Sequence, residues 1–143
     1  MNIVKKLTRI YAALALAVLA GCAGMSGSGP NVTLNGGNEV PPVSTAATGS
    51  GTITVGADLS VSGSVTVSGI SPTVAHIHDG AAGTNGPVIV PMVKSADNPN
   101  VWTFAPGAKL TEAQYEKFKA GGLYVNMHTV ANKGGEIRGQ LRP

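Results

Sequence analysis

Three histidines are present in the chain, and their spacing is the strongest indication of chemistry in the sequence. His76 and His78 flank a single residue, and His128 ends a strand-like run that starts at residue 122. In an extended strand, residues i and i+2 point to the same side, so His76 and His78 would project together as two ligands of one metal ion. We expect His128 to supply the third nitrogen.

Three imidazoles suit borderline transition metals such as copper, zinc, iron or nickel, and the single cysteine offers no thiolate pair for a soft site. Copper is our first expectation, with zinc or iron as alternatives. A ligating imidazole usually donates its other ring N–H to an outer acceptor, and Asp79, Asn126 and Glu136 are candidates for it. The sequence does not choose among them. The alternative for each histidine is a surface or hydrogen-bonded residue at a strand end.

A predicted hairpin brings His128 next to further polar residues. The turn sequence NKGG at 132–135 joins the strands at 123–129 and 136–141. Alternation places Asn126, His128, Glu136 and Arg138 on one face of this hairpin. Arg138 has two interpretations: a salt bridge with Glu136 or Asp79, or a fixed positive charge that guides a small anion to the metal.

The rest of the chain has an all-β pattern, in which short Val/Ile/Thr-rich runs recur between Gly, Pro, Asn and Asp clusters. These runs predict an antiparallel, Greek-key-like β-sandwich of about eight short strands, with a closed barrel as the alternative. One short helix interrupts the pattern, because TEAQ at 111–114 is a capping-box sequence and Gly121-Gly122 ends the helix. The predicted strands are 31–35, 49–55, 60–67, 73–78, 88–93, 101–104, 123–129 and 136–141.

The first thirty residues are typical of an export signal. A short basic region precedes an apolar stretch at 10–20 that is too short for a membrane span, and LAGC at 19–22 resembles a lipobox. We expect residues 1–21 to be a lipoprotein signal peptide, Cys22 to carry the lipid, and 22–30 to be a flexible tether. Ala23 after Cys22 favours the outer membrane. An ordinary secretory signal with an incidental cysteine is the alternative.

Charge argues against nucleic acid as a partner. Removal of three basic residues with the signal takes the ten Lys and Arg residues to seven, equal to the seven Asp and Glu residues. A near-neutral chain without a basic run lacks the electrostatic pattern of a nucleic-acid binder. Residues 31–143 are enough for one domain with one core.

Several motifs resemble the CHRD domain, a module first described in chordin and widespread in bacterial exported proteins. The resemblance extends over almost all of 31–141 and implies a β-sandwich. The motifs occur in the family's order, and they are LNGGNEVPP at 34–42, ATGSG at 47–51, AHIHDG at 75–80, GPVIV at 86–90, GLYVNMHT at 122–129 and NKGGEIRGQL at 132–141.

A weaker likeness links the chain to copper-zinc superoxide dismutases. These β-sandwich enzymes use a His-x-His strand, a later strand histidine and an arginine that guides superoxide, and His76, His78, His128 and Arg138 occur in that order here. The bridging histidine, the zinc-site ligands, the fourth copper ligand and the disulfide have no counterparts. If the protein is an enzyme, the likeness implies superoxide dismutation.

Two other functions stay open from the sequence. A non-catalytic interaction module would bind a protein partner, and it predicts histidines too far apart to share an ion. A structural envelope lipoprotein is the third. No nucleophile-elbow, phosphate-loop or zinc-protease motif is present in the chain.

Overall fold

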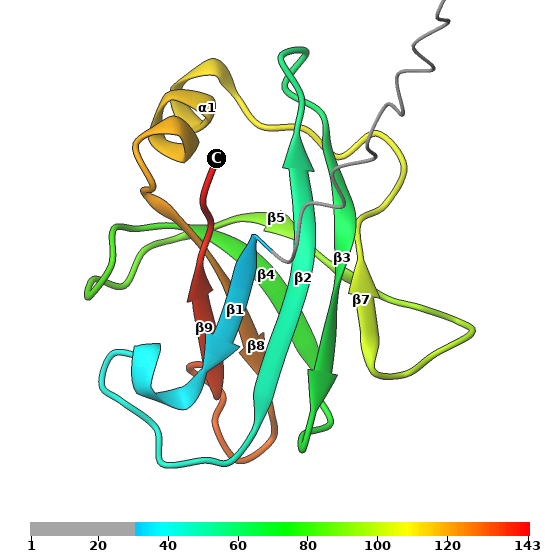
Figure 1. Ribbon diagram of the computed structural model, residues 1–143, viewed down its shortest axis with the longest axis vertical. Coiled ribbons are helices and arrows are strands. Elements are labelled where there is room, and N and C mark those ends of the chain that lie inside the picture. The colour runs from blue at the N-terminus through cyan, green and yellow to red at the C-terminus, as the bar shows by residue number, and fades with distance from the viewer. Residues whose placement is uncertain (1–30) are drawn as a thin grey trace, which may run out of the picture.

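The computed structural model describes residues 31–143, which form an all-β domain with one α-helix (Figure 1). The expected signal, Cys22 and the tether lie outside the described residues. Within 31–143 no helix has the length and apolar character needed to cross a membrane. The strands are β1 Val32–Asn35, β2 Thr48–Val55, β3 Val61–Ser68, β4 Val74–Asp79, β5 Val88–Pro91, β6 Val93–Lys94, β7 Val101–Thr103, β8 Leu123–His128 and β9 Ile137–Gln140.

These nine strands form one antiparallel sheet in the order β5-β4-β8-β9-β1-β2-β3-β7-β6. The pairs β4/β8, β9/β1 and β3/β7 join strands that are not consecutive in the chain, so the connections cross over as a Greek-key-like arrangement requires. In Figure 1 strands β4 and β8 lie behind β1 and β2, because the twisted sheet folds over on itself. The predicted all-β, antiparallel fold is confirmed.

The prediction of one strand over 88–93 was wrong, and the difference explains how the sheet nearly closes. Strand β5 pairs with β4 at one edge, and β6 pairs with β7 at the other edge. Only Met92 separates them, and its N–H donates to the carbonyl of Ala75 at 2.9 Å. Pro91 has no N–H to continue a ladder, so the chain leaves one edge there and joins the other.

The inner face of the sheet holds the apolar core. Strands β1, β3 and β8 contribute side chains that are almost fully enclosed, among them Leu34, Val65 and Val125. The helix α1 (Glu112–Lys119) begins at the expected capping box, in which Thr111 accepts from the N–H of Gln114. It covers one end of the sheet with Phe118, which joins the core, as expected of an end-capping helix (Figure 1).

The outer face of β4, β8, β9 and β1 carries a polar layer. Strand register places His76 opposite Asn126, Asn126 opposite Arg138, and Arg138 opposite Asn35, so one polar row crosses four strands. The loop 80–86 and the segment 36–45 fold over this face. All six residues of β8 are consequently buried, on both sides of the sheet.

Candidate metal centre

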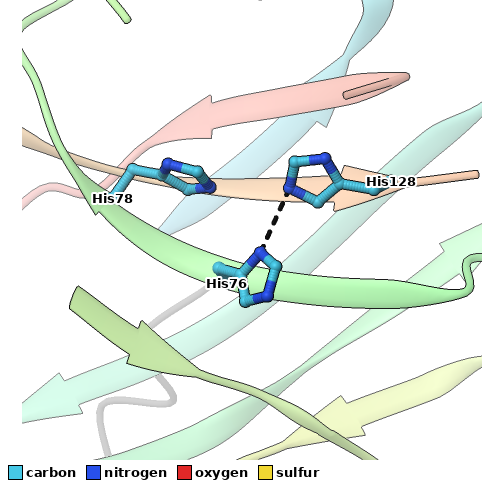
Figure 2. A group of neighbouring side chains, drawn as sticks. All are labelled: His76, His78 and His128. Carbon is cyan, nitrogen blue, oxygen red and sulfur yellow. Dashed lines mark hydrogen bonds between the residues drawn. The ribbon is translucent and has the colours of Figure 1, made fainter. Parts of the chain in front are cut away.

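The structure brings the three histidines together on the outer face of two paired strands. His76 and His78 lie on β4 and His128 on β8, with their rings converging (Figure 2). Val74 is the residue opposite His128, which makes His76 the diagonal neighbour of His128 on the same face. The ring centroids of His76 and His128 are 5.0 Å apart, and His78 lies 5.6 Å from each. Ligating nitrogens from all three lie within 4.8 Å of one another.

Backbone carbonyls select the ring nitrogen that two of these histidines present. Nδ1 of His78 lies 2.9 Å from the carbonyl oxygen of Gly86, and Nδ1 of His128 lies 3.0 Å from that of Lys133. A carbonyl oxygen can only accept, so each Nδ1 carries the hydrogen. In the neutral ring, Nε2 then keeps its lone pair. Nε2 of His78 has no partner, whereas Nε2 of His128 accepts a hydrogen bond from Nδ1 of His76, which a bound metal would replace.

The surroundings also keep the rings uncharged. Burial lowers the pKa of all three histidines below the ordinary value. The neighbouring imidazoles lower the pKa of His76 further, and His128 and Arg138 do the same for His78. A metal ligand must be the neutral imidazole, so the cluster is ready to bind at neutral pH without losing protons first.

Two observations fit a metal ion. Nε2 of His78 is buried and has no hydrogen-bond partner, which is costly for a polar atom unless a ligand occupies its lone pair. Nδ1 of His76 and Nε2 of His128 lie 3.2 Å apart (Figure 2). Two nitrogens at about 2.0–2.1 Å from one tetrahedral metal lie roughly 3.3 Å apart. His76 is the most exposed of the three, so the open side of the cluster is the side of His76.

The expected outer acceptors have other partners. Asp79 forms a salt bridge with Lys117 at 2.8 Å, and Glu136 accepts from Thr45 and Thr129. Asn126 does lie on the histidine face, but its amide points toward Glu39 and Gly134. The acceptors beside the rings are instead the two backbone carbonyls, which side-chain patterns in a sequence cannot reveal.

Arg138 is near the cluster but is not an exposed charge. Its side chain is 1% exposed, and Nη2 donates to the carbonyls of Ala81 and Thr84 at 2.9 and 2.8 Å. Its guanidinium carbon lies 3.4 Å from the ring centre of Tyr124. Neither expected salt bridge, to Glu136 or Asp79, is formed. This environment makes Arg138 a clamp on the loop 80–86, and it does not supply the accessible charge that guiding an anion needs.

Sequence reasoning missed Glu39 as a site residue. Its side chain is 5% exposed and lies beside Asn126, with Oε1 unpaired. Burial raises the pKa of Glu39 to about 7, against the opposing effect of Arg138 and a hydrogen bond from Asn126. The available signal was a lone carboxylate in the Gly/Asn/Pro-rich segment 34–42, where nothing else is ionisable.

A polar cavity of about 760 Å³ lies at the other end of this face, over β1 and β9. Arg138 and Glu39 are among its lining residues, whereas the three histidines are not. The cavity and the histidine cluster are therefore separate, and the loop 80–86 contributes Ala82 and Gly83 to the wall of the cavity.

The fold and the cluster define an all-β domain with a histidine-rich candidate metal centre on its outer face. The family model of the CHRD domain matches residues 31–141, and the chain therefore belongs to the CHRD-domain family. No curated protein and no solved structure matches the chain. Membership confirms the family expected from the motifs, while the function has to be argued from the site.

Proposed function

We propose that this protein binds one transition-metal ion through His76, His78 and His128, copper first and zinc or iron as alternatives. The observation that carries the proposal is the buried, unpartnered Nε2 of His78 beside two other imidazole nitrogens. The spacing also opposes the interaction-module alternative, which required histidines too far apart to share an ion. Export and attachment of a lipid to Cys22 would hold this metal centre at the bacterial envelope. The outer membrane is favoured, with the domain facing the periplasm or the exterior.

Binding for storage or delivery has more support than catalysis. Superoxide dismutation needs an open coordination position and an accessible positive charge to draw in the anion. The greater exposure of His76 supports an open coordination position on its side of the cluster. The burial of Arg138 weakens the second requirement, so superoxide dismutation is the reaction to assay once a redox-active metal has been found.

Metal content tests the proposal. The exported protein is purified without an affinity tag and analysed by mass spectrometry, beside a His76→Ala/His78→Ala/His128→Ala variant. We expect near one equivalent of metal, lost in the variant. A Lys119→Ala variant is the control and should keep its metal, because Lys119 pairs with Glu116 on the exposed helix. Absence of metal from the unaltered protein, together with no uptake of added copper or zinc, would refute the proposal.

A further inference from the structure

Two buried residues beside the histidine cluster, Tyr124 and Arg138, form a stacked group with His78. His78 and Tyr124 are directly opposite each other on β4 and β8, and their rings stack at 4.8 Å between centres with 10° between their planes. The guanidinium of Arg138 lies over the Tyr124 ring, 3.4 Å from its centre. Register places Arg138 opposite Asn126 and two residues along β9 from Gln140, which pairs with Tyr124. Tyr124 is thus in contact with both the histidine and the arginine.

The loop 80–86 ties the same three side chains together a second time. Arg138 binds this loop through the carbonyls of Ala81 and Thr84. The N–H of Gly86 donates to the Tyr124 hydroxyl at 3.1 Å, and the carbonyl of Gly86 accepts from Nδ1 of His78. Arg138 is therefore connected to His78 in two ways, through the stacked ring of Tyr124 and through the loop 80–86.

Gly86 shows how tightly this arrangement is fixed. A Cβ atom on Gly86 would lie 1.6 Å from the carbonyl oxygen of Asp79, so only glycine permits the loop to lie this close to β4. The N–H of Asp79 donates to the carbonyl of Pro87 at 3.0 Å and holds the far end of the loop. The carbonyl that selects the nitrogen of His78 consequently has little freedom to move.

From these contacts we propose that Arg138 and Tyr124 are positioning residues of the metal centre, which hold His78 with Nδ1 toward Gly86 and Nε2 toward the ion. The inference rests on the proposed metal binding and adds to it. Outer contacts of this kind change metal affinity typically by 10–100-fold when they are removed. A role in folding alone would leave the orientation of His78 unchanged in any variant that folds.

The test uses two conservative variants of the exported protein, purified in detergent with 15N-labelled histidine. Tyr124→Phe keeps the stacked ring and removes the acceptor for Gly86, and Arg138→Lys keeps the charge and removes the planar fork. Tyr115→Phe and Arg142→Lys are the matched controls, on the helix and at the exposed C-terminal end. Zn²⁺ affinity is measured by competition with a chromophoric chelator, and the histidine tautomers by NMR of the metal-free protein.

We expect Zn²⁺ affinity to fall by about 10–100-fold in Tyr124→Phe and Arg138→Lys, with His78 losing its preference for hydrogen at Nδ1 and both controls unchanged. Unchanged Zn²⁺ affinity and an unchanged His78 tautomer in Tyr124→Phe would overturn the positioning role and leave metal binding intact. If Arg138→Lys does not fold, Tyr124→Phe alone is the test. Failure of the unaltered protein to bind Zn²⁺ or Cu²⁺ would instead refute the proposed function, and the positioning role with it.

Discussion

Strands β3 and β8 have similar lengths and lie in the same sheet, yet their surroundings differ. In β3 the inward valines are buried while the serines and threonine between them are exposed. In β8 every residue is buried, including Tyr124, Asn126 and His128 on the outward side. The difference lies in what covers the outer face, which is solvent over β3 and folded loops over β8. The outer face of one antiparallel sheet can therefore be exposed to solvent at some strands and covered at others, where it forms a second, polar interior.

The polar interior depends on partners supplied from far along the chain. Arg138 is held by the loop 80–86, and Asn85 of that loop donates in turn to the carbonyl of Val40 at 2.8 Å. Three segments distant in sequence therefore meet over β8 and β9. Removing a partner here leaves buried polar groups unpaired, whereas removing a side chain from the outer face of β3 leaves only water to rearrange.

The largest effect is expected from Arg138→Met. This change removes the two charge-assisted hydrogen bonds to the carbonyls of Ala81 and Thr84, each contributing roughly 1.5–3 kcal/mol. Ala81 keeps the hydrogen bonds that Thr84 donates to its carbonyl, whereas the carbonyl of Thr84 loses the donor from Arg138. We expect the free energy of unfolding to fall by about 3–5 kcal/mol in urea denaturation. Arg142→Met, at an exposed site, should change it by less than about 0.5 kcal/mol. Equal effects of the two substitutions would show that the covered face is not a second interior.

The next effect concerns the buried carboxyl of Glu39. Burial raises the pKa of Glu39 from its ordinary value of 4.5 to about 7 in the folded protein. The folded state holds this proton more tightly, so the contribution to stability is complete below pH 4.5 and is lost as the pH rises to about 7. The shift corresponds to about 3 kcal/mol. Glu39→Gln should lack this loss, gaining stability over the unaltered protein as the pH rises.

Urea unfolding at pH 4.5, 6 and 8 measures this difference. Glu116→Gln, an exposed carboxylate on the helix, serves as the control and should follow the unaltered protein at each pH. Comparing each variant with the unaltered protein cancels the titration of the histidines. Stability curves of Glu39→Gln that run parallel to those of the unaltered protein would place Glu39 in contact with water.

The contrast between the strands also explains what the sequence could predict. The alternation in 60–67 follows from one wet and one buried face, so β3 was readable from residue types alone. The capping box gave the start of the helix, and the i, i+2 rule gave the shared face of His76 and His78. The cluster of three histidines was therefore predictable as a hypothesis, provided that β8 was assumed to pair with β4.

The covering of β8 was not readable in the same way. Polar residues on one face of a hairpin predict contact with solvent, and nothing local indicates that a glycine-containing loop 38 residues or more away in sequence will cover them. The buried state of Arg138 and Glu39, and the carbonyl partners of His78 and His128, follow from that covering. Long-range backbone contacts of this type leave no pattern in side-chain identity.

A smaller effect is expected for the pH dependence of metal binding. Burial lowers the pKa of His76, His78 and His128 below 6.5, so protons compete with a metal only under acidic conditions. Affinity for Zn²⁺ should change little between pH 8 and pH 6.5. Below that range it should fall by up to about tenfold per pH unit for each imidazole that gains a proton. Chelator competition across the range measures it, and a steep fall already at pH 7.5 would mean that the rings are solvated.

The smallest effect is expected on the outer face of β3, where Ser62 and Thr66 are exposed. Their hydroxyls exchange hydrogen bonds with water in both the folded and the unfolded chain, so Ser62→Ala and Thr66→Ala should each change the free energy of unfolding by less than about 0.5 kcal/mol. Metal content should not change. Urea denaturation and mass spectrometry provide the two measurements. A loss above about 1 kcal/mol in either variant would mean that this face has hidden partners too, and the distinction between a wet and a covered half of the sheet would no longer hold.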